Sequence, residues 1–135
     1  MPQEEKQLLL AVLCARLPYG VKFHYTKHPQ SNIDQDCNGT AIGYYCNLIV
    51  SANDKDFCVD RCKLYLRPMS SMTEEERQEY GLVLCDELSI NQYDWLNKNH
   101  FDYRGLIEKG LALEAPEGMY NIKENKLCHN TTIIQ

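Results

Sequence analysis

The sequence lacks any hydrophobic run long enough to cross a lipid bilayer. Its longest apolar stretch covers residues 8–15, whereas a membrane-spanning helix needs about 20 residues. Two glutamates precede this stretch and an arginine follows it, unlike the basic start and small-residue cleavage site of a secretory signal. We therefore expect no membrane segment and a cytosolic protein.

Positive charge is also scarce. The 135 residues include 14 Lys and Arg against 19 Asp and Glu, which gives a net charge of −5. A protein that grips phosphate backbones over a wide surface is normally basic, so nucleic acid is not an expected partner. The hydrophobic share of 44% and the charged share of 24% are typical of a folded globular chain.

The familiar catalytic motifs are missing. The chain has no glycine-rich phosphate loop, no His-Glu-x-x-His pair and no Gly-x-Ser-x-Gly elbow. Seven cysteines and four histidines allow many chance combinations, so no Cys–His dyad stands out. We predict no catalytic residue and no cofactor, and we favour a protein that is not an enzyme.

Cysteine is the residue type that is abundant. The odd number and the absence of a framework spacing predict free thiols that behave as small hydrophobic side chains. The spacing of Cys58 and Cys62, together with Cys37 and Cys46, permits a zinc site. No matching second pair accompanies it, so we expect no metal.

The first half of the chain predicts one helix followed by strands. Leucines and valine at helical spacing predict a helix over residues 3–16. Alternating apolar and polar residues predict a strand over 21–26, and β-branched and aromatic residues predict a second over 40–50. A third strand begins at 57–59, and residues 62–68 are expected to run extended away from the sheet.

The second half predicts helices. Thr73 and Glu76 form a capping-box pattern, which marks the start of a helix. Another helix is expected over 89–99 with Ser89 as its N-cap, and a short final helix over 104–109.

These elements predict an α+β fold with an N-terminal helix and a small antiparallel sheet, curled or barrel-like. We expect a single domain over 1–135. Residues 1–66 would hold the helix and β-meander, 67–122 would be mainly helical, and 123–135 would form a tail.

The densest polar and aromatic cluster lies between the predicted helices. Trp95 or Tyr103 would stack on a planar ligand, and Arg104 would clamp an anion, with His100 and Asp102 beside them. The same cluster also suits a structural role, in which the tryptophan anchors the core and Asp102 caps the following turn.

A second candidate site precedes the capped helix. Arg67, Pro68 and the hydroxyls of Ser70 and Ser71 could hold a phosphate or carboxylate at a helix N-terminus. The alternative is an extended linker with a cap, because the glutamates at 74–76 already place carboxylates there.

Residues 64–76 and 94–107 resemble a family of small uncharacterised proteins of gut anaerobic bacteria and their phages and prophages. The similarity extends to residues 110–116 and 14–22. The family has no assigned activity, so the resemblance supplies no catalytic residue.

The resemblance indicates the biological context of the protein but no chemical activity. It favours a non-enzymatic phage or mobile-element accessory protein in the host cytosol, which binds a host protein or a small, nucleotide-like ligand in defence or counter-defence. The alternatives are a small hydrolase built on His100, Asp102 and a thiol, or an oligomeric phage structural component.

Overall fold

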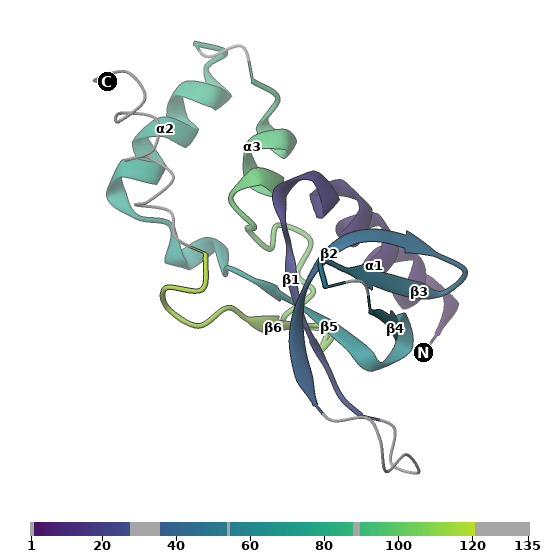
Figure 1. Cartoon of the computed structure of the whole chain (residues 1–135). Helices are drawn as coiled ribbons and strands as arrows, with labels where there is room; N and C mark the ends of the chain where they lie inside the picture. Colours follow the sequence, from purple (N-terminus) through teal and green to yellow (C-terminus); the bar gives the residue numbers. More distant parts are fainter. Residues whose placement is uncertain (1, 28–35, 54, 88–89, 121–135) are drawn as a thin grey trace.

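The computed structural model describes residues 2–27, 36–53, 55–87 and 90–120. In chain order the elements are α1 (Gln3–Arg16), η1 (Leu17–Tyr19), β1 (Lys22–Tyr25), β2 (Cys37–Tyr45), β3 (Leu48–Ser51), β4 (Asp56–Cys58), η2 (Val59–Arg61), β5 (Cys62–Leu66), η3 (Met69–Ser71), α2 (Glu74–Leu84), α3 (Gln92–Lys98) and β6 (Ala112–Glu114), where η marks a 3₁₀ turn (Figure 1). The predicted tail, residues 123–135, lies outside the described residues.

Helix α1 has the bounds that the sequence predicts. Leu9, Val12 and Leu13 recur at helical spacing, and all three are buried. The chain leaves the helix through Pro18 in η1 and turns at Gly20, whose φ of 68° suits a residue without a side chain.

The sheet is mixed, with the strand order β4-β3-β2-β1-β5-β6. All neighbouring strands are antiparallel except β5 and β6, which are parallel. The sheet is therefore mixed, and not antiparallel throughout as the sequence analysis expected. The sheet is curled: Phe57 of β4 contacts Phe23 and Tyr25 of β1, with ring centroids 5.5 and 4.9 Å apart, although two strands separate β4 from β1. It does not close into a barrel, because β4 and β6 remain its edges.

The predicted strand over 40–50 is two strands joined by a tight hairpin. Cys46 and Asn47 form the turn with φ of 46° and 67°, as a two-residue hairpin requires. The sequence prediction missed this turn because it lacks the Asn-Gly signature. The pairing of β2 with β3 shifts between Ala41 and Gly43, which marks a bulge in β2.

The prediction that residues 62–68 run away from the sheet is wrong. Strand β5 lies inside the sheet, between β1 and β6. Its alternation explains the position, because Cys62, Leu64 and Leu66 are buried on one face while Lys63 is exposed on the other.

The mainly helical segment predicted over 67–122 is only partly helical. Helix α2 begins at the predicted capping box, whereas α3 is capped by Asn91, whose Oδ1 accepts from the amide of Tyr93 at 2.8 Å. Ser89, the predicted cap, lies outside the described residues. Residues 104–109 form turns rather than a helix, and the chain then enters β6.

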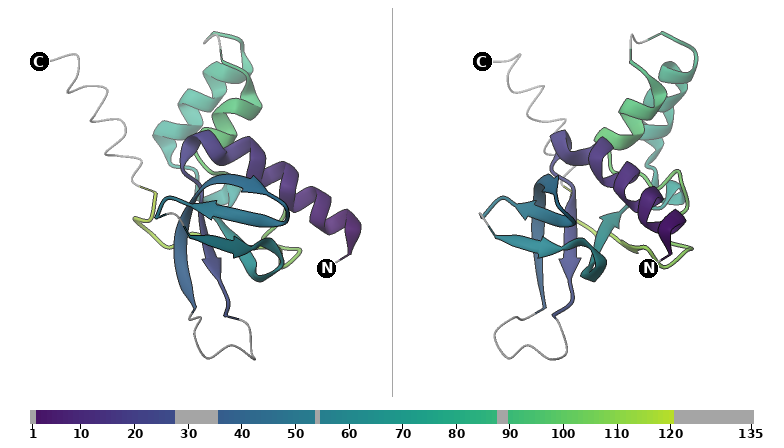
Figure 2. Two further views of the ribbon diagram at one scale, coloured as in Figure 1. Left: turned by 45° about the vertical axis from the view of Figure 1, so that its right-hand side comes forward. Right: turned by 90° about the vertical axis from the view of Figure 1, so that its right-hand side faces the viewer.

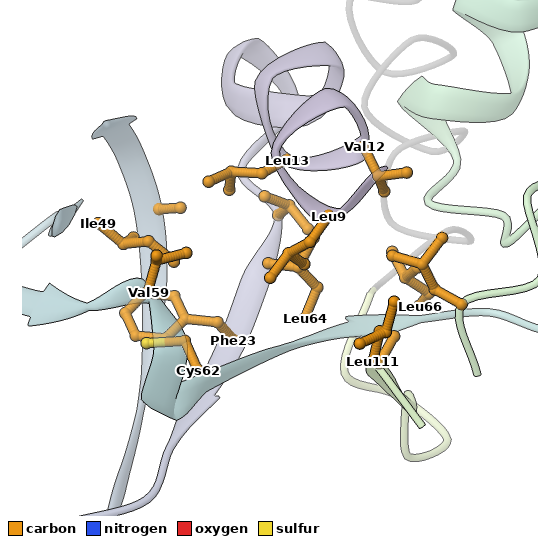
Figure 3. Close-up of a cluster of buried hydrophobic side chains, with 14 of the residues drawn as sticks. Leu9, Val12, Leu13, Phe23, Ile49, Val59, Cys62, Leu64, Leu66 and Leu111 are labelled. Atoms are coloured by element: carbon orange, nitrogen blue, oxygen red, sulfur yellow. The ribbon is translucent and has the colours of Figure 1, made fainter. Parts of the chain in front are cut away.

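Buried apolar side chains form two clusters. The first, which we call the sheet core, lies between α1 and the strands; Figure 3 shows Leu9, Val12 and Leu13 pointing toward Phe23, Leu64 and Leu66. The second, the helical core, consists of Met72, Val83, Trp95, Leu96 and Phe101. Helices α2 and α3 lie side by side beyond one end of the sheet (Figure 2).

Among the residues that the structure describes, no helix has the length and apolar character needed to cross a membrane.

Candidate functional site

A buried ion pair joins the end of β5 to α2. Arg67 donates to Oε2 and Oε1 of Glu76 at 2.8 and 2.7 Å, and its guanidinium carbon lies 4.1 Å from the centre of the Phe101 ring. Burial favours a higher pKa for the Glu76 carboxyl, but hydrogen bonds from Arg67 and the Thr73 amide outweigh it, so the pKa is lowered. The guanidinium of Arg67, which was predicted to help hold a phosphate or carboxylate, is therefore engaged inside the protein.

Trp95 occupies the interior of the helical core. Its ring stacks between Tyr80 and Phe101, at 5.1 and 5.8 Å between centroids, and its Nε1 donates to Glu79 at 2.7 Å. With 3% of its surface exposed, it offers no face to a planar ligand. The structural alternative for this tryptophan is thus the one that the packing supports.

Asp102 also has a structural position. Its two carboxylate oxygens accept from the amides of Leu106 and Ile107 at 2.8 and 2.9 Å, so it caps the turns that precede β6. Its own amide donates to the carbonyl of Arg67 at 2.8 Å. Both carboxylate oxygens therefore serve the backbone.

Arg16 is a buried cation that the sequence interpretation did not single out. Its surface is 0% exposed, and its guanidinium donates to the carbonyls of Val12, at 3.1 Å, and Phe101. It also lies 5.3 Å from the centre of the Tyr103 ring. Burial lowers the pKa of Arg16. The available signal was its helical spacing from Val12, which places it on the buried face of α1.

His100 is buried beside these cations. It has a left-handed φ of 63°, and its ring stacks on Tyr120 with 3.8 Å between centroids. Burial, and then the positive charges of Arg16 and Arg67, lower the pKa of His100 to about 3. The imidazole is therefore neutral at ordinary pH.

Tyr120 was also missed by sequence interpretation. Its hydroxyl accepts from the amide of Lys22 at 2.8 Å and donates to the carbonyl of Tyr65 at 2.7 Å. It thus stands where a backbone hydrogen bond would otherwise join β1 to β5, and burial raises its pKa. No local pattern marks this residue, because its partners lie far away in the sequence.

The remaining predicted site residues do not lie together. Tyr103 donates through its hydroxyl to Asn97 at 3.0 Å, whereas Ser70 and Arg104 are exposed. The structure therefore brings together Arg67, Trp95, His100, Asp102 and Tyr103 around Phe101 as a packed polar core, and leaves Ser70 and Arg104 at the surface.

One cavity of about 380 Å³ lies over Arg67. It is lined by Arg67, Pro68, Ser71, Thr73, Glu114, Ala115, Pro116, Glu117, Gly118 and Tyr120. Because Glu76 neutralises Arg67 and the cavity carries the carboxylates of Glu114 and Glu117, it does not favour an anion.

A larger groove of about 740 Å³ lies where the curled sheet brings β4 toward β1 and β2. We call it the hairpin groove; it is lined by Tyr25, Asp36, Cys37, Asn38, Gly39, Asn53, Lys55, Asp56, Phe57 and Cys58. The ring centroids of Tyr25 and Phe57 are 4.9 Å apart; Phe57 is partly exposed, whereas Tyr25 is 6% exposed. The charged and amide side chains around them are exposed.

Thiols gather beside this groove. Cys37 and Cys58 line it, and burial, followed by the proximity of these two thiols, raises the pKa of Cys62 to about 12. Within the described ranges, no group of three or more His, Cys, Asp or Glu side chains is arranged to hold a metal ion.

Comparisons with protein-family models, with curated proteins and with solved structures find no match to this chain. The resemblance to the gut-bacterial and phage family therefore stays a prediction.

Proposed function

We propose that this protein is a non-enzymatic binding protein that holds a small ligand in the hairpin groove. The observation that carries the proposal is the groove itself, which combines a volume of about 740 Å³ with the partly exposed ring of Phe57 and a polar rim. Small-molecule sites commonly have volumes of about 300–1,000 Å³ and this mixture of apolar surface and few polar groups.

The rim indicates the class of ligand. Asp36 accepts from the amide of Lys27 and Asp56 accepts from the hydroxyl of Tyr45, each through one carboxylate oxygen. The described lining has two carboxylates and one cation, Lys55. This balance of charge favours a ligand that donates hydrogen bonds and carries little negative charge. A nucleoside fits this description better than a nucleotide does.

The hydrolase alternative has less support. His100 is buried against Tyr120, and the carboxylate oxygens of Asp102 are occupied by two backbone amides. A general base must reach the proton that it removes, and neither residue is among those that line the cavity over Arg67 or the hairpin groove.

The setting follows from the sequence resemblance. We place the protein among phage or mobile-element accessory proteins in the bacterial cytosol, where it would act in defence or counter-defence. A host protein is the alternative partner, and the groove would then receive one of its side chains.

A structural or assembly role is the second candidate. Four large hydrophobic side chains at the far end of α2 and α3 are about half exposed: Leu82, Leu84, Ile90 and Tyr93. Such exposure is typical of a surface that meets another protein. Light scattering that shows a stable oligomer at low concentration would support this role.

The binding proposal is tested by calorimetry with adenosine, guanosine, cytidine and uridine and with their monophosphates. We expect heat from at least one nucleoside, and binding about tenfold weaker in Asp36→Asn, because a hydrogen bond to a charged group is lost. Asp86→Asn makes the same charge change at an exposed position elsewhere and should bind normally. No heat from any of the eight compounds would contradict the proposal.

A further inference from the structure

The face of the sheet that points away from α1 carries an ordered group of polar side chains. We call it the outer sheet face; it consists of Lys22 and His24 of β1, Asn38 and Thr40 of β2, and Lys63 and Tyr65 of β5. These strands are neighbours, and the pairing places His24 between Asn38 and Lys63. Phe23, Leu64 and Leu66, at alternate positions, are buried on the opposite face, in the sheet core (Figure 3).

The six residues of this face together carry positive charge, although the whole protein is acidic. Lys22 and Lys63 are the charged members, and none of the six residues is a carboxylate. Charges separated by more than about 10 Å are largely screened in moderate salt. The local charge, rather than the net charge of −5, therefore decides which partner the face attracts at contact.

Two aromatic rings on the face are held in place by one amide. Oδ1 of Asn38 lies 2.8 Å from Nδ1 of His24 and accepts from the hydroxyl of Tyr65 at 3.0 Å. The two rings meet edge to face at 6.4 Å, and both are partly exposed. Because they are fixed beforehand, a stacked partner would lose little side-chain freedom on binding.

The lysines flank these rings. Lys63 is exposed directly across from His24, and the ammonium group of Lys22 is positioned by Oγ1 of Thr40 at 3.2 Å. Aromatic rings with lysines on either side, on an exposed sheet face, are typical of proteins that bind single-stranded nucleic acid. In such proteins the bases stack on aromatic side chains and the phosphates lie near basic side chains.

We propose that the outer sheet face binds a short stretch of single-stranded nucleic acid. Tyr65 and His24 stack on bases, and Lys22 and Lys63 contact the phosphates. Three neighbouring strands span only about 10 Å, which suits roughly two nucleotides. The acid surplus of the sequence argues against a wide phosphate-binding surface, and this face is narrow.

Fluorescence anisotropy with labelled hexanucleotides of thymidine, uridine and adenosine tests the proposal on the full chain at low salt. Two phosphate contacts predict that log K falls with log salt with a slope of about −1.4. We expect Tyr65→Ala and His24→Ala each to weaken binding about tenfold, because each loses a stacked base.

Charge is tested separately from stacking. Lys63→Glu should weaken binding and reduce the salt slope, whereas Lys98→Glu makes the same charge change at an exposed position on α3 and should bind as the parent does. Thermal melts of all four variants show whether each is folded, and Lys63→Glu keeps the proposal testable if a ring variant unfolds.

Three results would overturn the proposal. The first is no binding of any hexanucleotide up to about 100 µM, which is within the range of weak non-specific binding. The second is equal binding by the parent, Tyr65→Ala and Lys63→Glu. The third is an abasic oligonucleotide or a hexaglutamate peptide that binds as tightly as the hexanucleotides, since the face would then recognise charge alone.

Discussion

The two cores of this molecule are built from different interactions. The sheet core is apolar: Leu13, Phe23 and Leu64 are fully buried among other hydrocarbon side chains. The helical core instead packs Trp95 and Phe101 against buried charged and polar groups, chiefly the Arg67–Glu76 pair. Both exclude water, but only the second must keep charges satisfied while it does so.

This difference determines how each core responds to change. Burial of hydrocarbon stabilises the fold at about 25 cal/mol per Å² and does not depend on protonation. A buried ion pair gains little over an apolar pair, yet breaking it leaves a charge without a partner. We therefore expect the α2–α3 region to be the part of the protein whose stability is most easily lost by one substitution or by acid.

The largest expected effect follows from removing one charge of the buried pair. Glu76→Gln leaves Arg67 buried without a counter-ion, while glutamine can still fill the third position of a capping box. We expect the free energy of unfolding to fall by about 3–5 kcal/mol, measured by urea denaturation.

A surface pair provides the matched control. Glu74 lies 3.6 Å from Arg77, with both side chains mostly exposed, so Glu74→Gln should cost less than about 1 kcal/mol. The double variant Arg67→Met/Glu76→Leu should regain much of the loss, since it removes both buried charges. Similar small losses in Glu76→Gln and Glu74→Gln would show that burial of the ion pair is unimportant.

Acid provides the second way to separate the two cores. The pKa of His100 is about 3 in the folded protein against an ordinary value of 6.5, so folding favours the neutral ring. This preference stabilises the folded protein fully at a pH above 6.5, the ordinary pKa of histidine. The stabilisation is lost as the pH falls toward about 3, the pKa of His100 in the folded protein. Below pH 6.5 the free energy of unfolding should fall with decreasing pH, with a slope that approaches about 1.4 kcal/mol per pH unit. Urea denaturation at pH 7, 6 and 5 would detect this change.

Two variants check the source of this slope. Asparagine tolerates the left-handed backbone at position 100, so His100→Asn should have a smaller slope than the parent. Leu64→Ala, in the sheet core, should lose about 2–5 kcal/mol at every pH, because the cavity that it leaves does not titrate. An unchanged slope in His100→Asn would assign the acid sensitivity to other groups.

The sequence predicts those parts of the structure whose causes are local. The α1 bounds follow from periodic leucines and Pro18, and the start of α2 follows from Thr73 and Glu76, three residues apart. The caps and turns formed by Asn91 and Cys46 were missed because several residue types compete for these positions and tertiary packing decides among them.

For the candidate site, the sequence predicted which residues lie together but not what each of them does. The sequence placed Trp95, His100 and Asp102 together, and they do lie around Phe101. The partners that fix their roles, Arg16 and Tyr120, come from distant segments, and a single sequence carries no pattern for such contacts. The hairpin groove likewise exists only because the sheet curls.

The smallest expected effect concerns the tyrosine that connects the two cores. Tyr120→Phe keeps the ring that stacks on His100 but removes the hydroxyl shared by the amide of Lys22 and the carbonyl of Tyr65. Two backbone groups between β1 and β5 then lose a partner, so we expect a loss of about 1–3 kcal/mol and faster hydrogen exchange at the Lys22 amide. Tyr45→Phe, whose hydroxyl meets Asp56 at the surface, should change stability little. Unchanged exchange at Lys22 in Tyr120→Phe would mean that water replaces the hydroxyl, and that the two cores are joined by the ring stack alone.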